Sequence, residues 1–116
     1  MIMRITRCKL HPGTWRRFEQ TYKETVVAKG AEVDGLRGRW LVQDDDDPET
    51  GYAVSLWDSR EAMWVHEQSA FSMHEVLPAL KPYMVGECTT TYGAMRVIQA
   101  WEDECGPYAL PYGGEL

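Results

Sequence analysis

Residues 50–63 read TGYAVSLWDSREAM, and this stretch contains the clearest boundary between two elements in the chain. Residues 52–57 alternate with the two-residue period of a β-strand, with Tyr52, Val54 and Leu56 on one side and Ala53, Ser55 and Trp57 on the other. Asp58 or Ser59 then supplies a helix N-cap, and Glu61 stands where a capping-box partner of Asp58 would lie. The stretch therefore predicts a strand that passes directly into a helix.

A second extended run precedes this strand. Residues 36–43 follow Gly35, and residues 44–51 form a polar turn that contains Pro48 and Gly51. Two such runs around a short polar turn predict a β-hairpin. The four consecutive aspartates, residues 44–47, cannot all face one calcium ion, so we interpret them as a solvated hairpin tip.

The N-terminal part predicts a strand and a helix. Residues 1–10 alternate loosely and stop at a His-Pro-Gly turn, residues 11–13. Thr14 is a plausible N-cap for a helix over residues 15–29, which Gly30 ends. The apolar residues of this helix recur at steps of three and four: Trp15, Phe18, Tyr22 and Val26.

The part after Asp58 predicts a broken helix and a last strand. Its inward stripe comprises Ala62, Met63, His66, Ala70, Met73, Leu77, Leu80 and Met84. Because Pro78 and Pro82 cannot both lie inside one straight helix, we expect a break near Ser69 and a short second helix that ends by Met84. Gly86 then precedes a strand over residues 87–98, where three threonines and a tyrosine favour extended structure.

The order strand, helix, two strands, helix, strand defines the fold class. It is the α+β, ferredoxin-like β-α-β-β-α-β order, with an antiparallel sheet and both helical layers on one face. The other face is then bare, although its strands carry apolar residues on both sides. A bare apolar face favours a homodimer, and the space between helices and sheet suits an apolar molecule.

Composition excludes several classes of protein. The chain has 116 residues and a net charge of -6, with scattered basic residues, so nucleic acid is not an expected partner. No signal peptide is visible, and no apolar run approaches the roughly 20 residues that span a membrane. The cysteines are Cys8, Cys88 and Cys105, an odd number without a Cys-x-x-Cys pair, which indicates a reducing, cytoplasmic setting. Cys8 and Cys88 fall on neighbouring strands, where two buried thiols are favoured over a bridge.

Two segments follow from this pattern. Residues 1–97 form the α+β domain, and residues 98–116 form an extended C-terminal tail rich in Gly and Pro. The tail also carries Trp101, Tyr108, Leu110 and Tyr112, so we expect it to pack on its own subunit or on a dimer partner.

The run Trp57-Asp58-Ser59-Arg60-Glu61-Ala62-Met63 resembles the antibiotic biosynthesis monooxygenase domain, as do Pro12-Gly13 and the segment Gly35-Leu36-Arg37-Gly38. The resemblance covers about residues 1–97. It implies a dimeric α+β barrel with a pocket between helices and sheet in each subunit. It also implies oxidation of a phenolic or polycyclic aromatic molecule by O2 without metal or flavin as cofactor.

Haem-degrading members of that family imply a different cofactor. They carry an Asn in the first strand, a Trp in the second helix and a haem-ligating His further along. In this chain the Asn position falls at Arg7 or Cys8, the Trp position falls on His66, and His74 lies near the His position. The chain contains no asparagine, so haem is disfavoured as a cofactor, and the quinone-forming members also often use an Asn.

His66 is the candidate general base, because it lies on the inward half of its helix and titrates near neutral pH. The alternative is a hydrogen-bonded core histidine. The predicted substrate pocket comprises Trp57, Met63, Trp64, Phe71, Met73, His74, Arg7 and Tyr92. Trp64 in a regular helix points away from the stripe, and Arg7 and Tyr92 lie on adjacent strands, so helix packing and a strand pair are their alternatives. No spacing of histidines indicates a zinc site.

Three functions are consistent with these patterns. The leading hypothesis is a cofactor-independent monooxygenase that acts on a small aromatic molecule. The alternative is a non-catalytic ligand-binding or stress-related dimeric barrel, and the third is a haem-binding or haem-degrading dimer.

Overall fold

The computed structural model describes residues 1–28 and 33–99 of the chain. Four strands form one antiparallel sheet: β1 (Ile2–Leu10), β2 (Leu36–Gln43), β3 (Thr50–Trp57) and β4 (Met84–Ala94). Their order across the sheet is β2-β3-β1-β4, so β1 pairs on both sides and β2 and β4 are the edges. The predicted α+β fold with its β-α-β-β-α-β order is confirmed.

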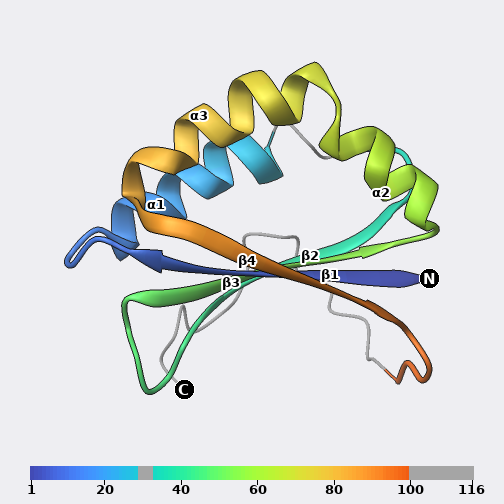
Figure 1. The fold of residues 1–116 in the computed structure, drawn as a ribbon, viewed down its shortest axis with the longest axis horizontal. Coiled ribbons are helices and arrows are strands. Elements are labelled where there is room, and N and C mark those ends of the chain that lie inside the picture. The colour runs from blue at the N-terminus through green and yellow to red at the C-terminus, as the bar shows by residue number, and fades with distance from the viewer. Residues whose placement is uncertain (29–32, 100–116) are drawn as a thin grey trace.

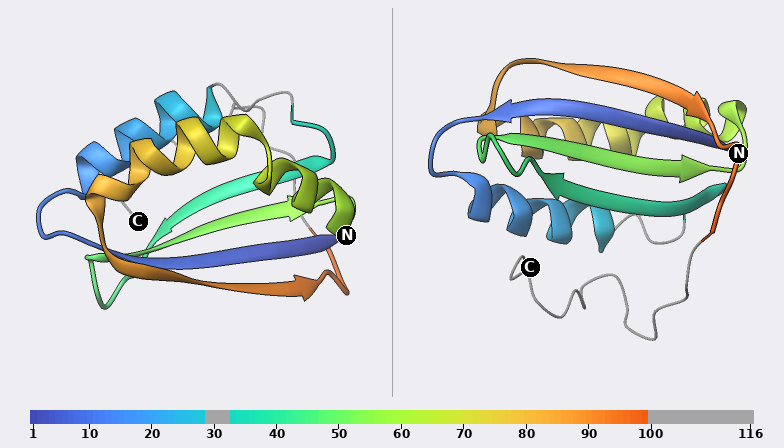
Figure 2. Two further views of the ribbon diagram at one scale, coloured as in Figure 1. Left: turned by 45° about the horizontal axis from the view of Figure 1, so that its top comes forward. Right: turned by 90° about the horizontal axis from the view of Figure 1, so that it is seen from below.

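The helical segments cover one face of this sheet (Figure 1). They are α1 (Trp15–Tyr22) with a π-helical continuation (Lys23–Val27), α2 (Arg60–Glu67), a π-helical segment (Phe71–Val76), α3 (Leu77–Leu80) and a 3-10 turn (Lys81–Tyr83). Figure 2 shows α1 and α3 side by side over one end of the sheet and α2 over the other end. The helical segments therefore cover both ends of one face of the sheet.

The predicted break near Ser69 is present. Ser59 caps α2 by accepting a hydrogen bond from the Ala62 N–H at 3.1 Å. After α2 ends at Glu67, the Ser69 hydroxyl accepts the Ser72 N–H at 3.1 Å and so caps the next helical segment. The chain therefore contains two separately capped helices, and α2 takes its own direction.

Strand β4 differs from its predicted bounds. It begins at Met84, before Gly86, and ends at Ala94, before residue 98. Gly86 has a φ of +69°, and the pairing of β1 with β4 shifts register between Arg7 and Lys9. A glycine in the left-handed region allows an irregular residue within a strand, which the simple turn signal of Gly86 did not predict.

The acidic hairpin tip is an ordered turn. Asp44 accepts hydrogen bonds from the N–H groups of Asp46 and Asp47, and Asp47 accepts from Thr50 and from Lys9. The bond from Lys9, followed by that from Thr50, lowers the pKa of Asp47 to about 2. The aspartates thus stabilise the turn between β2 and β3.

Two apolar clusters support the helical layer. The larger joins α1 and α3 to the end of β1 and contains Leu10, Phe18, Tyr22, Val26 and Leu80. The smaller joins α2 to the other end of the sheet and contains Ile2, Trp57 and Met63.

The opposite face of the sheet is apolar, and no described element covers it (Figure 1). The strand register shows which residues share this face: Met3, Ile5, Tyr52, Val54, Leu56, Trp40 and Val42. Trp40 and Val42 are 48% and 46% exposed. We call this surface the outer face.

The structure corrects the expectation of two thiols, because Cys8 and Cys88 form a disulfide with Cα atoms 4.5 Å apart. The irregular register after Arg7 places Cys88 directly beside Cys8. Disulfides persist in oxidising environments, so the cysteines no longer support the cytoplasmic prediction. Cys105, the helix end at Gly30 and most of the predicted tail lie outside the described residues.

No helix in residues 1–28 and 33–99 has the length and apolar character to cross a membrane.

We expect the Cys8→Ser/Cys88→Ser double variant to lose about 4 kcal/mol of unfolding free energy, since a bridge that closes a long loop restricts the unfolded chain. The loop here spans a sequence separation of 80 residues. Guanidinium unfolding of the variant and the wild type measures the difference. The bridge would be contradicted if the two proteins unfolded at the same guanidinium concentration and if a reductant did not change the unfolding of the wild type.

Candidate functional site

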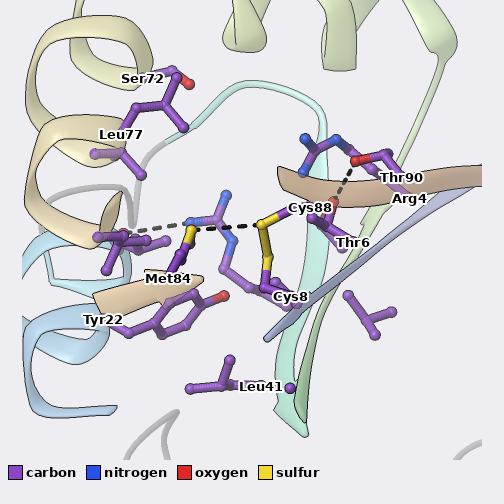
Figure 3. Close-up of a pocket in the computed structure, with 18 of the residues that line it drawn as sticks. Arg4, Thr6, Cys8, Tyr22, Leu41, Ser72, Leu77, Met84, Cys88 and Thr90 are labelled. Atoms are coloured by element: carbon purple, nitrogen blue, oxygen red, sulfur yellow. Dashed lines mark hydrogen bonds between the residues drawn. A yellow bond between two sulfur atoms is a disulfide. The ribbon is translucent and has the colours of Figure 1, made fainter. Parts of the chain in front are cut away.

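A cavity of about 240 Å³ lies between the helices and the sheet. The helical layer supplies most of its apolar lining, with Phe18, Val26, Val76, Leu77 and Leu80. Its floor comes from the sheet and carries polar groups (Figure 3). A dry engineered cavity of roughly 150 Å³ holds one benzene ring, so this cavity matches a molecule of two or three fused rings.

One row of residues crosses the floor from strand to strand. Arg39 of β2 pairs with Ser55 of β3, Ser55 with Arg4 of β1, and Arg4 with Tyr92 of β4. Arg39, Ser55 and Arg4 line the cavity. Because facing residues on neighbouring strands share one side of a sheet, two guanidinium groups enter the same apolar space.

The two arginines differ in their partners. Arg4 Nε lies 2.7 Å from Glu67 Oε1, an ion pair that ties the floor to α2. Arg39 makes one long hydrogen bond, 3.4 Å to the backbone oxygen of Val26. Within the described residues, Arg39 pairs with no carboxylate. Burial lowers the pKa of Arg39, but a guanidinium stays protonated in proteins.

His66 lines the cavity and also an open groove beside α2 that includes Val33, Ala62 and Phe71. Its ring lies 5.3 Å from the Trp57 ring and 6.2 Å from the Phe71 ring, between centroids. The imidazole has no hydrogen-bond partner among the described residues. Burial, and then the charges of Arg39 and Arg4, lower the pKa of His66, so the ring is neutral near pH 7.

Further groups complete the walls. Burial raises the pKa of the Tyr22 hydroxyl, which therefore stays protonated as a donor. Met84 Sδ lies 3.5 Å from Cys88 Sγ of the Cys8–Cys88 disulfide, and Figure 3 shows these groups and Tyr22 among the residues that line the cavity. The Thr6 and Thr90 hydroxyls share a hydrogen bond of 3.0 Å, and Trp57 Nε1 donates to Ser55 Oγ at 2.8 Å.

The predicted site residues separate into two groups. Trp57 and His66 line the cavity, and Phe71 lines the adjoining groove with His66. Met63 is buried in the cluster with Trp57 and lies outside the lining. The others point elsewhere: Trp64 is 60% and Met73 46% exposed, and His74, Arg7 and Tyr92 are also exposed.

Local geometry explains these placements. Arg7 lies on the outer face, because strand alternation directs Arg4, Thr6 and Cys8 inward. Tyr92 shares the floor row, but it lies on the edge strand and its ring contacts the Arg60 guanidinium at 5.8 Å.

The π-helical segment, Phe71–Val76, changes which residues after α2 face the sheet. A π-helix takes more residues per turn than an α-helix. Ser72 and Val76 consequently line the cavity in place of Met73 and His74.

Sequence reasoning missed Arg4, Arg39, Tyr22, Ser55 and Glu67 as cavity residues. A signal for the arginines existed. Arg4 lies an even number of residues before buried Leu10, and Arg39 lies two residues before Leu41, so both share the face of apolar core residues.

The residues at the haem-associated positions do not fit a haem site. His74, near the haem-ligating position, is exposed and absent from the cavity lining, and the first strand offers no asparagine. Within the described ranges, no group of three His, Cys, Asp or Glu side chains is placed to hold a metal ion.

The fold is a small α+β domain with a cavity between its helices and its sheet. The model of the family "Antibiotic biosynthesis monooxygenase" matches residues 1–74, and the chain belongs to this family. No curated protein sequence matches the chain.

Solved structures share the fold at low sequence identity. A crystal structure of an antibiotic biosynthesis monooxygenase has a TM-score of 0.68 at 18% identity, covering 85% of this chain and 100% of that one. A conserved protein from Methanosarcina mazei Go1 has a TM-score of 0.72 at 15% identity, with 82% and 92% covered. Rv0793 from Mycobacterium tuberculosis has a TM-score of 0.69 at 15% identity, covering 85% of this chain and 98% of that one.

We expect the imidazole of His66 to titrate below the ordinary histidine value of 6.5, because burial and two guanidinium charges oppose its protonation. Replacing Arg39 by Gln removes one of those charges and raises this pKa. Imidazole resonances followed by NMR against pH measure both values. A His66 pKa that is unchanged in Arg39→Gln would contradict the proximity of the two groups.

Proposed function

We propose that this chain is an oxygenase that oxidises a small fused-ring phenol, or its keto form, with O2 and without metal or flavin, and that His66 is its general base. The observation that carries the proposal is a neutral, half-buried imidazole beside two guanidinium groups in an apolar cavity. Membership of the antibiotic biosynthesis monooxygenase family supports this type of reaction.

The first step is removal of a proton from the substrate by neutral His66. Arg39 and Arg4 stabilise the resulting anion, and the apolar roof excludes water that would otherwise solvate it. The electron-rich anion transfers electrons to O2 and forms a carbon–oxygen bond. His66 returns its proton to the peroxide, and loss of water leaves a quinone, so one substrate and one O2 give one quinone and one water.

The lowered pKa of His66 supports its role as a base. A base must be unprotonated when it meets the substrate, and a lower pKa keeps the imidazole neutral to a lower pH. The reaction rate should therefore decline at a lower pH than it would with a histidine of ordinary pKa. Trp57 and Phe71 restrict the ring on either side.

Oxygen uptake with anthrone tests the proposal. We expect wild-type protein to consume O2 and produce anthraquinone above the buffer rate, and His66→Ala to lose about 10²–10⁴-fold of that rate. His11→Ala is the matched control, since His11 is exposed in the turn after β1. No uptake above buffer, or equal uptake by His66→Ala, would refute the proposal. Saturable anthrone binding without uptake would instead assign a non-catalytic ligand-binding role.

The outer face supports a homodimer as the functional unit. Its apolar rows extend over β1, β2 and β3, and Trp40 and Val42 are nearly half exposed. Monomeric proteins rarely leave such a continuous apolar surface in water. Packing two sheets face to face removes it and leaves the cavity of each subunit on the far side.

Val42→Lys should shift the protein from dimer to monomer, because it would bury an unpaired charge within the proposed interface. Light scattering coupled to size exclusion measures the mass. Val65→Lys is the control, since Val65 is 68% exposed on α2, away from the outer face. A wild type that is monomeric at micromolar concentration, or a dimer unaffected by Val42→Lys, would contradict this interface.

A further inference from the structure

The cavity carries one uncompensated positive charge. Its ionised lining residues are Arg4, Arg39 and Glu67, and Arg4 and Glu67 form an ion pair. His66 is neutral near pH 7 because its pKa is lowered by burial. Arg39 remains, in a chain whose net charge is -6. A cation that faces an apolar cavity is costly unless an anion meets it.

The donors around Arg39 are mostly unused. A guanidinium has five N–H donors in a planar fork that fits both oxygens of a carboxylate. Among the described residues, Arg39 makes one hydrogen bond, the long bond to Val26. Tyr22, whose hydroxyl interacts electrostatically with Arg39, lines the same cavity as a second, neutral donor.

The pair and the candidate base line the same cavity from different elements. Tyr22 belongs to α1 and Arg39 to the edge strand β2, whereas His66 belongs to α2 and packs on Trp57. Arg4 lies between Ser55 and the other edge strand and is tied to α2 by Glu67. A fused-ring ligand can thus meet a cation at one side while its reacting ring meets His66.

We propose that the cavity selects aromatic carboxylates: the ligand carries an ionised carboxyl group that Arg39 and Tyr22 bind, in addition to the ring that reacts. The carboxylate proposal rests on the proposed function, because it assumes that the same cavity is the substrate site. It concerns how the protein binds the substrate before any reaction, and it makes no claim about the chemical step. A charge that is present before any reaction favours a substrate that is already an anion. Arg39 is then a specificity-determining residue.

Two isosteric probes test the proposal, 2-naphthoate and its neutral analogue 2-naphthamide. Titration calorimetry at pH 7.5 should show that wild-type protein binds 2-naphthoate about tenfold to a hundredfold more tightly than 2-naphthamide, as charged hydrogen bonds do. Arg39→Gln should abolish this ratio while leaving the affinity for 2-naphthamide unchanged. Arg39→Lys should retain part of it.

Arg17→Gln is the matched control, because it removes the same charge from an exposed position of α1. It should keep the full preference, which excludes a general effect of net charge. Equal affinity for the two probes in the wild type overturns the proposal even if Arg39→Gln does not fold. A preference that survives in a folded Arg39→Gln also overturns it.

The test of the carboxylate subsite and the test of the proposed function can succeed or fail independently. Anthrone has no carboxyl group and is uncharged before it reacts, so oxygen uptake with anthrone tests the base without ground-state binding of a carboxylate by Arg39. Uptake without a preference for 2-naphthoate would refute the subsite alone. A preference for 2-naphthoate without anthrone uptake would support the subsite and refute the oxygenase.

Discussion

The alternation of side chains along β1 is the constraint on which the rest of this structure depends. Because β1 pairs with β3 on one side and β4 on the other, it cannot change its register without disturbing the whole sheet. Its inward residues are Arg4, Thr6, Cys8 and Leu10, which supply the ion pair, the hydroxyl pair, the disulfide and the end of the core. Its outward residues Met3 and Ile5 belong to the apolar outer face. A register shift of one residue would exchange the inward and outward residues of β1. Both the polar floor of the cavity and the apolar outer face would then be lost.

Most of the fold could be predicted because it is encoded locally. The strand over residues 36–43 has its predicted bounds, and the passage from β3 into α2 follows from the alternation up to Trp57 and the cap at Ser59. The irregular places were harder. Gly86 looks like a turn residue and does have a positive φ, but β4 continues on both sides of it, at the irregularity in its pairing with β1. The wider π-helical segment, Phe71–Val76, leaves no clear mark in a periodicity of 3.6.

The candidate site was only partly predictable, since a cavity depends on long-range register. His66 and Trp57 were found because a helical stripe and a strand end are local features. Arg7 was preferred to Arg4 because residues 1–10 alternate only loosely, and the side of β1 that faces the helices follows from the burial of Leu10 in the structure. Arg39 was missed because its relation to Arg4 passes through Ser55 on the strand between them.

The disulfide between Cys8 and Cys88 has a chemical consequence for the cavity it lines. Quinones are electrophiles to which free thiolates add, and a pair of reduced cysteines would present such nucleophiles to the quinone of the proposed reaction. In the bridged form both sulfur atoms are already bonded and cannot add. An oxygenase with a reduced floor would be open to inactivation by its own product, in proportion to the turnovers it completes. The bridge thus makes the floor chemically inert as well as tying an edge strand to the centre of the sheet.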